Sequence, residues 1–150
     1  MDTIELLKKN LLFKGCTSED FELLSGLIQE RQVKPNTTIF SEKMPAEALY
    51  IVKSGKIKIS VMESEGEEIG LLELGPGDFF GELALIQESS RAVTARAETA
   101  AEVVMLARRD FLALLDLDPR VAAKITLAIA RLLAMRVKAY SGRLREILLS

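Results

Sequence analysis

Lys56-Ile57-Lys58-Ile59-Ser60-Val61 alternates polar and apolar side chains, as in a strand with one wet face and one packed face. Other short β-prone runs flank this stretch at residues 37–40, 49–53, 68–74, 92–97 and 102–106. Turn residues separate these runs at intervals of roughly ten residues: Lys34-Pro35-Asn36, Ser54-Gly55, Ser64-Glu65-Gly66 and Gly75-Pro76-Gly77-Asp78. The rhythm predicts a mainly β fold, an antiparallel jelly-roll barrel over about residues 32–107.

Helices are expected on both sides of the barrel. Before it, helices are predicted over residues 2–9 and 18–30, the second introduced by Thr17 with Asp20 three residues later, the spacing of a capping box. After it, a short helix is predicted over residues 108–115, as part of a C-terminal helical region at about 108–150. All 150 residues are expected to form one domain.

A long C-terminal helix is predicted to begin at Asp118-Pro119, an N-cap and first-turn pair, and to run to about Tyr140. Gly142 is expected to break it, with residues 143–149 forming a further turn or two.

The charges of this helix are unevenly placed. Residues 119–150 carry seven basic and one acidic side chain, whereas residues 1–118 carry thirteen and twenty-one. Four of the basic residues share one stripe: Arg120, Lys124, Arg131 and Lys138. The rest of the circumference is mostly apolar, interrupted mainly by Thr126 and Arg136, so cover on more than one side is expected. A homodimer through this helix is predicted, with burial inside the monomer as the alternative.

The composition argues against several functions. With no histidine, the chain lacks the commonest general base and metal ligand, so no catalytic residue, metal site or cofactor is predicted, and the protein is not expected to be an enzyme. The single cysteine, Cys16, cannot form an intramolecular disulfide. No uninterrupted apolar run reaches the roughly 18 residues that a membrane span needs. A soluble, cytoplasmic protein is expected.

One constellation is suited to binding an anion. Phe80-Gly81-Glu82 precedes Leu83-Ala84-Leu85-Ile86, a segment that predicts one or two helical turns between strands. The first N–H groups of a helix are unpaired and favour a phosphate, and Gly81 allows close approach to the backbone. Arg91 follows nine residues after Glu82 and carries a fork of donors for the same phosphate. Glu82, an acceptor when ionised, suits a sugar hydroxyl.

A purely structural interpretation stays open on spacing alone: Glu82 as an ordinary first-turn acid and Arg91 as a surface residue paired with Glu88. The glycines of residues 75–81 do not match a dinucleotide fingerprint, because the third glycine comes one residue late and the surroundings are all β.

Phe80-Gly81-Glu82-Leu83-Ala84-Leu85-Ile86, followed by Arg91-Ala92-Val93-Thr94, resembles the phosphate-binding cassette of the cyclic-nucleotide-binding domain family. That family includes catabolite-activator-type regulators, cyclic-nucleotide-dependent kinases and gated channels. The resemblance extends over nearly the whole chain: N-terminal helices, an eight-stranded jelly roll with the cassette inserted late, then a short and a long helix.

The resemblance implies roles for individual residues. Gly81, Leu83 and Ala84 are expected to offer backbone groups near the ribose and cyclic phosphate, and Glu82 to accept the ribose 2′-hydroxyl. Arg91 is expected to pair with the phosphate, helped by the N–H of Ala92. Because family members with a hydroxyl residue after the arginine often favour guanine, Ala92 indicates cyclic AMP over cyclic GMP. The long helix is expected to cap the base and to move on binding.

The chain departs from the family pattern at two places. Where the family usually has a glycine followed by an acidic residue, the turn 41–45 has Ser41-Glu42-Lys43-Met44-Pro45, so only Gly55, the later glycine, matches clearly. Ser90 replaces a common proline before the arginine. The fold and both charged contacts are expected to survive these changes.

A ligand-sensing regulatory domain is therefore the leading hypothesis, with an effector that the sequence does not identify. Two alternatives remain. One is a fragment of a catabolite-activator-type transcription regulator without its DNA-binding part, since the eight residues after Gly142 are too few for a helix-turn-helix. The other is a dimerisation or interaction module that keeps the cassette without using it.

Overall fold

The computed structural model describes residues 2–63 and 66–149, and for Tyr140 and residues 143–149 it describes the backbone alone. The helices are α1 (Thr3–Lys9), the 3-10 turn η1 (Leu11–Phe13), α2 (Ser18–Ser25), α3 (Leu83–Ile86), α4 (Arg108–Leu117) and α5 (Pro119–Leu149). The strands are β1 (Ile28–Val33), β2 (Thr38–Phe40), β3 (Ala48–Ser54), β4 (Ile57–Met62), β5 (Glu68–Leu74), β6 (Phe79–Phe80), β7 (Thr94–Ala97) and β8 (Ala101–Ala107).

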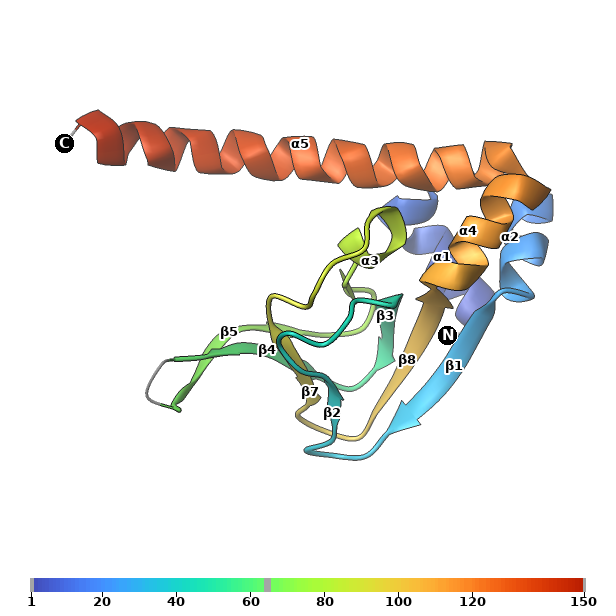
Figure 1. Ribbon diagram of the computed structural model, residues 1–150. Coiled ribbons are helices and arrows are strands. Elements are labelled where there is room, and N and C mark those ends of the chain that lie inside the picture. Colours follow the sequence, from blue (N-terminus) through green and yellow to red (C-terminus); the bar gives the residue numbers. More distant parts are fainter. Residues whose placement is uncertain (1, 64–65, 150) are drawn as a thin grey trace.

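The strands form two antiparallel sheets of four strands, with the orders β1-β8-β3-β6 and β2-β7-β4-β5 (Figure 1). The predicted antiparallel β architecture is therefore confirmed. No closed barrel is found among the described strands, because the ladders pair the strands within two separate sheets. The jelly-roll pattern itself stays a prediction.

The predicted helix over 18–30 is wrong in its second half. Thr17 and Asp20 do form the predicted capping box, but α2 ends at Ser25 with Gly26 as its C-cap. Residues 28–33 instead pair with β8, from Ile28 opposite Leu106 to Val33 opposite Ala101. The apolar pattern of residues 26–30 is compatible with a helix, but pairing with the distant strand β8 determines their structure. The sheet therefore begins at Ile28, earlier than the expected residue 32.

Two apolar cores hold the fold together. The first lies between the sheets and includes Val52, Ile57, Ala95 and Val103, all fully buried. The second joins one sheet to the helices and includes Leu7, Leu24, Leu114 and Ile125. The N-terminal helices and the first half of α5 thus share one core with β3 and β8, and α5 packs on η1 and α4.

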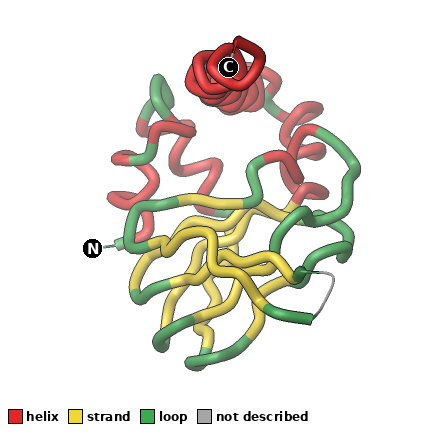
Figure 2. The backbone as a smooth tube through the Cα atoms, turned by 90° about the vertical axis from the view of Figure 1, so that its left-hand side faces the viewer, coloured by secondary structure: helices red, strands yellow, loops and turns green. Residues whose placement is uncertain are grey.

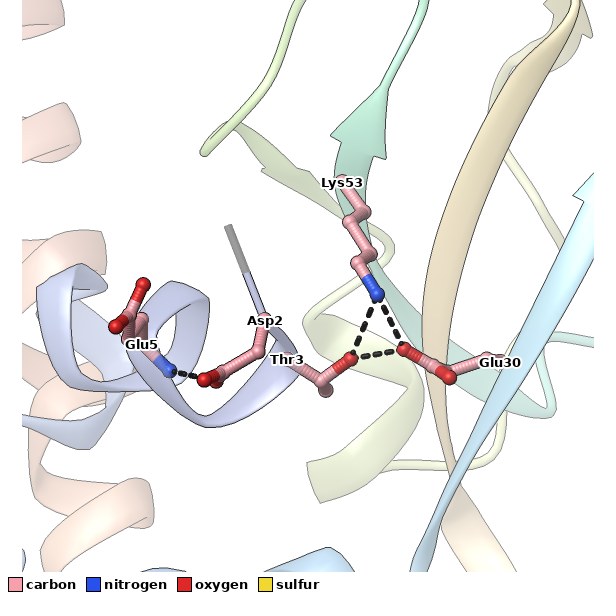
Figure 3. A network of polar contacts seen from close by, with 5 residues as sticks. All are labelled: Asp2, Thr3, Glu5, Glu30 and Lys53. Atoms are coloured by element: carbon pink, nitrogen blue, oxygen red, sulfur yellow. Dashed lines mark hydrogen bonds and ion pairs between the residues drawn. The ribbon is translucent and has the colours of Figure 1, made fainter.

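Polar contacts tie the N-terminus to that sheet (Figure 3). Asp2 caps α1 by accepting the N–H of Glu5, and Thr3 donates to the carboxylate of Glu30 on β1. Lys53 on β3 pairs with the same carboxylate, with Nζ 2.8 Å from Oε1. The hydrogen bond from Lys53, together with the one from Thr3, lowers the pKa of Glu30. One carboxylate therefore links α1, β1 and β3.

α5 is one continuous helix from Pro119 to Leu149, so the predicted break at Gly142 is wrong. A glycine inside a helix costs about 1 kcal/mol relative to alanine, which neighbouring helix formers can offset. Ile125 and Ile129 are buried against the body, whereas Met135 and Val137 are exposed. Figure 2 looks along α5 and shows it above the strands. None of the described helices is both long and apolar enough to cross a membrane.

Candidate functional site

The predicted cassette is built on a strand that the sequence analysis missed. Phe79 and Phe80 form β6, which pairs with β3 through Ile51 and Tyr50. Two residues carry too little periodicity for a strand prediction. α3 follows, as predicted, and is held against the core by buried Ala84 and Leu85. The N–H of Ala84 donates to the carbonyl of Gly81 (3.1 Å), so this backbone donor, expected to face a ligand, is engaged within the turn.

Gly81 stands where a side chain would not fit. Its φ of +79° lies in the left-handed region, and a Cβ built there would lie 2.6 Å from Nη1 of Arg91 and 3.0 Å from the carbonyl oxygen of Ala48. Both the conformation and the contact therefore require glycine. The guanidinium predicted to bind phosphate lies directly beside the predicted glycine.

Arg91 is buried, with 8% of its surface exposed, so the alternative of a surface residue paired with Glu88 is wrong. Glu88 pairs instead with Arg108, at 3.4 Å between Nη1 and Oε1. The Arg91 Nη2 donates to the carbonyl of Ala48 (2.8 Å), but its buried Nε has no hydrogen-bond partner among the described residues. A buried donor left unpaired is costly, and the Nε of Arg108, which lines another cavity, is unpartnered in the same way.

The backbone around Arg91 is anchored to the turn that departs from the family pattern. The N–H of Lys43 donates to the carbonyl of Arg91, and the N–H of Arg91 donates to the carbonyl of Met44, both at 2.8 Å. Lys43 itself has a φ of +70°, the left-handed conformation that favours glycine. The turn therefore keeps its shape without a glycine and holds the arginine in place.

The guanidinium of Arg91 lies over an aromatic ring, with its carbon 4.0 Å from the centroid of Phe40. Burial lowers the pKa of Arg91, while Tyr50, Glu47 and Glu82 oppose that shift. An arginine still carries its charge at neutral pH. The site thus contains a fixed, poorly hydrated positive charge.

Glu82 is also buried, at 5% exposure, and forms an ion pair with Arg136 of α5. The carboxylate side chain is 7% exposed and the arginine side chain 45%, so the contact lies at the edge of the site. Arg136 was missed as a site residue. Its interruption of the apolar circumference of the helix was a signal that could have found it.

These residues line a cavity of about 440 Å³. Every predicted site residue except Thr94 lines it: Phe80, Gly81, Glu82, Leu83, Ala84, Arg91, Ala92 and Val93. Further lining residues were not predicted, among them Phe40, Ile59, Leu72, Leu74 and Arg136. The cavity thus combines apolar walls with a few charged groups, as small-molecule sites commonly do.

Thr94 does not belong to this cavity. Its side chain is buried on β7, and its hydroxyl accepts the N–H of Glu42 (3.1 Å). Thr94 lines a neighbouring cavity of about 510 Å³ together with Glu68 and Arg96. The strand begins at Thr94, two residues later than predicted, so Ala92 and Val93 belong to the preceding loop, where they face the first cavity.

Comparisons with known proteins agree with this geometry. The chain is 35% identical over 125 residues to the cyclic AMP receptor protein of Thermus thermophilus, a match that covers 83% of this chain and 58% of that protein. It is 27% identical over 144 residues to a CRP-like cAMP-activated global transcriptional regulator of Mycobacterium tuberculosis, covering 96% and 62%. The chain therefore spans less than two thirds of the length of these relatives.

Solved structures show the same fold. The N-terminal domain of a transcriptional regulator from Streptomyces coelicolor superposes with a TM-score of 0.81 at 30% identity, covering 90% of this chain and 94% of that one. The catabolite activator protein of Thermus thermophilus gives 0.80 at 33%, covering 92% and 63%. The regulatory domain of Toxoplasma gondii PKA with cAMP gives 0.67 at 34%, covering 73% and 42%.

The family model described as "Cyclic nucleotide-binding domain" matches residues 30–118. That range contains both sheets apart from the first two residues of β1, and also contains the cassette and α4. The resemblance predicted from Phe80–Thr94 is confirmed, and this chain belongs to the cyclic nucleotide-binding domain family.

Proposed function

We propose that this regulatory domain senses a 3′,5′-cyclic nucleotide in the cavity that Gly81 and Arg91 line, and that it is not an enzyme. The observation that carries the proposal is the buried Nε of Arg91, which has no acceptor among the described residues although Nη2 has one. A cyclic phosphate supplies charged acceptors in the geometry that a guanidinium fork matches. The neighbouring Gly81 has no side chain, so the guanidinium can lie close to the cassette backbone.

In this proposal, the carboxylate of Glu82 binds the ribose. This carboxylate is almost fully buried, and it has acceptor sites beyond the one that Arg136 uses. The 2′-hydroxyl is on the ribose carbon next to C3′, whose oxygen belongs to the cyclic phosphate. A 2′-hydroxyl that donates to Glu82 would therefore lie close to the phosphate. The cavity volume of about 440 Å³ lies in the range of small-molecule sites.

Cyclic AMP is the preferred ligand in this proposal. Ala92 follows Arg91 and offers no hydroxyl to the base edge, where family members that favour guanine often carry one. Two kinds of relative support the same choice: a cyclic AMP receptor protein, and a kinase regulatory domain solved with cAMP. The expected difference between the two nucleotides is modest.

Isothermal titration calorimetry tests the proposal with cAMP, cGMP and the open-chain 5′-AMP. We expect saturable heat with both cyclic nucleotides, a lower Kd for cAMP, and a much weaker signal with 5′-AMP, whose phosphate is attached differently. No heat with either cyclic nucleotide at millimolar concentration would contradict the proposal and favour a module that keeps the cassette unused.

Movement of α5 is the output that we propose. Arg136 connects α5 to the carboxylate that the ribose would use, so a ligand must share or displace this contact. A ligand shifts such an equilibrium only by its differential affinity for the two helix positions. Spin labels attached at Arg31 and Lys138, in a Cys16→Ser background, would report the distance between sheet and helix. We expect cAMP to shift it in the wild type and not in Arg136→Met; an unchanged wild-type distance would refute the movement.

A homodimer through α5 is proposed for a specific reason. Exposed positions on this helix follow the alternating spacing of four and three residues typical of a coiled-coil seam: Ala123, Leu127, Ala130, Ala134, Val137 and Ser141. This seam faces away from the buried Ile125 and Ile129. We expect Ala134→Glu to shift sedimentation toward monomer and Lys138→Glu, outside the seam, to leave it unchanged. Equal sedimentation of wild type and Ala134→Glu would refute this interface.

The second candidate function is that of a fragment of a transcription regulator. The likeness to the N-terminal domain of such a regulator, covering 94% of that chain, favours it. In that case the nucleotide site is the same, and DNA binding is not expected from the described residues. Retention on duplex DNA that falls steeply with salt would overturn this expectation.

A further inference from the structure

Three buried aromatic rings lie beneath the arginine of the proposed site. Phe40, Tyr50 and Phe80 are 5%, 7% and 7% exposed. The centroids of Phe40 and Tyr50 are 5.9 Å apart, those of Phe40 and Phe80 are 5.8 Å apart, and Tyr50 stacks on Phe80 at 5.2 Å with 13° between planes. They come from β2, β3 and β6, which belong to both sheets. The cluster therefore forms a buried floor that spans the two sheets.

Arg91 lies on this floor. Its guanidinium carbon is 4.0 Å from the centroid of Phe40 and 5.9 Å from that of Tyr50, within the range of a cation–π interaction. The only side-chain hydrogen bond of Arg91 among the described residues goes from Nη2 to the carbonyl of Ala48. Two constraints, a ring on one face and a carbonyl on one edge, thus define the orientation of the guanidinium and leave Nε without a partner.

This arrangement has a consequence for binding. An arginine side chain loses considerable rotamer freedom when it is immobilised. If folding has already immobilised the side chain, no further side-chain entropy is lost when the ligand binds, and the affinity is higher. A ring suits this task because it holds the cation without using any N–H group, so the remaining donors stay available to an anion.

We propose that Phe40 is a positioning residue that holds the Arg91 guanidinium ready for the phosphate, with Tyr50 as a second, more distant support. The proposal rests on the proposed function for its effect on affinity, but its effect on Arg91 exists in the free protein. The Phe40 side chain neither donates nor accepts a hydrogen bond. Its contribution is the negative face of the ring and its fixed place on β2.

A simple packing role for Phe40 makes a different prediction. If the ring only filled volume, substitutions that keep the volume would leave the affinity unchanged. Fluorination of phenylalanine lowers the electron density of the ring face while it changes the shape little, and each added fluorine weakens a cation–π interaction.

The experiment places 4-fluoro-, 3,5-difluoro- and pentafluorophenylalanine at position 40 and measures the Kd for cAMP by calorimetry. We expect the Kd to rise stepwise with fluorine number, by roughly 3- to 10-fold at the end of the series. The same series at Phe111, which is buried in the helical core, is the control and should leave the Kd within twofold of wild type. A flat series at position 40 in a protein that binds cAMP would overturn the positioning role.

A second readout needs no ligand. The ¹⁵N order parameter of the Arg91 Nε–H group should be high in the wild type and fall in Phe40→Leu, which keeps an apolar side chain without a ring. Rigid Nε–H in both proteins would overturn the proposal even where cAMP binds. If the wild type binds no cyclic nucleotide, the proposed function fails, and the order parameters still decide whether Phe40 positions Arg91.

Discussion

Two neighbouring cavities differ in how their charged groups are satisfied. The larger, about 510 Å³, contains Arg96, which pairs with Glu68 at 3.0 Å, and Glu68 also accepts the hydroxyl of Ser60 at 2.7 Å. The hydrogen bond from Ser60, with that from Arg96, lowers the pKa of Glu68. The smaller, about 440 Å³, contains Arg91 with an unpartnered buried Nε. The volume of a cavity therefore does not distinguish the proposed site, since a third cavity, lined by Arg108, is larger still at about 530 Å³.

The difference is the reason for placing the proposed binding site in the smaller cavity. In the larger cavity, the named charges form a closed set of contacts, so a ligand would have to break them. In the smaller cavity, one cation is buried, held in place and short of an acceptor, and a ligand would complete its hydrogen bonds. Four pairs of matched substitutions separate the two regions further.

The largest effect is expected from the two arginines. Arg91→Lys should weaken cAMP binding on the order of 100-fold or more, because a lysine cannot provide the planar fork and would be buried beside an unmatched phosphate. Arg96→Lys should change the Kd less than about threefold, since its partner lies in the other cavity. Calorimetry on both variants checks this. Comparable losses in the two would show that the arginines had been assigned to the wrong roles.

A smaller but still large effect is expected at Gly81. Gly81→Ala adds a Cβ that would lie 2.6 Å from Arg91 Nη1, so the guanidinium must shift, and we expect cAMP affinity to fall about tenfold. Gly77→Ala is the control: its φ of +91° is also left-handed, but its added Cβ meets nothing within 4 Å. Both variants should lose about 1 kcal/mol or more of folding stability. Chemical denaturation and calorimetry distinguish the shared strain from the specific clash; equal Kd values would contradict the clash.

The two cavity-lining glutamates, Glu82 and Glu68, give the third comparison. Glu82→Gln keeps the shape but weakens the acceptor for the ribose hydroxyl, so the Kd for cAMP should rise about tenfold. Glu68→Gln should leave the Kd near the wild-type value. The 2′-deoxy form of cAMP provides the check, because its affinity should not depend on Glu82→Gln if that carboxylate binds the 2′-hydroxyl. If Glu82→Gln also raised the Kd for the 2′-deoxy form tenfold, Glu82 would not be the group that accepts the 2′-hydroxyl.

The smallest effect is expected at the turn that lines the larger cavity and is hydrogen-bonded to the backbone of Arg91. Lys43 has a φ of +70°, so Lys43→Gly should stabilise the fold by about 1 kcal/mol in urea unfolding. Asn36, at φ +65°, is the comparison, and Asn36→Gly should stabilise less because asparagine tolerates this conformation. Neither change should alter the Kd. A loss of stability in Lys43→Gly would mean that the lysine side chain contributes more than its conformation costs.

Much of the site was predictable because its signals are local. Gly81, Glu82 and the helical segment after them are consecutive, and Arg91 follows on the same loop, so a single motif identified them. The turns between strands and the capping box at Thr17 were also predictable from neighbouring residues. The misplaced end of α2, the undetected β6 and the expected break at Gly142 all concern positions where long-range packing or a continuous helix outweighed a local preference.

The strand-rich middle, the flanking helices and the cassette follow from local patterns of residues, because hydrophobic periodicity and turn chemistry act over a few residues. The cavity that holds Arg91, the ring beneath it, and the contact of Arg136 with Glu82 depend on how distant segments pack. Phe40, Arg91 and Arg136 are far apart along the chain, and their contacts exist only once both sheets and α5 are packed. Pairing over such distances depends on the whole fold, which no local pattern contains.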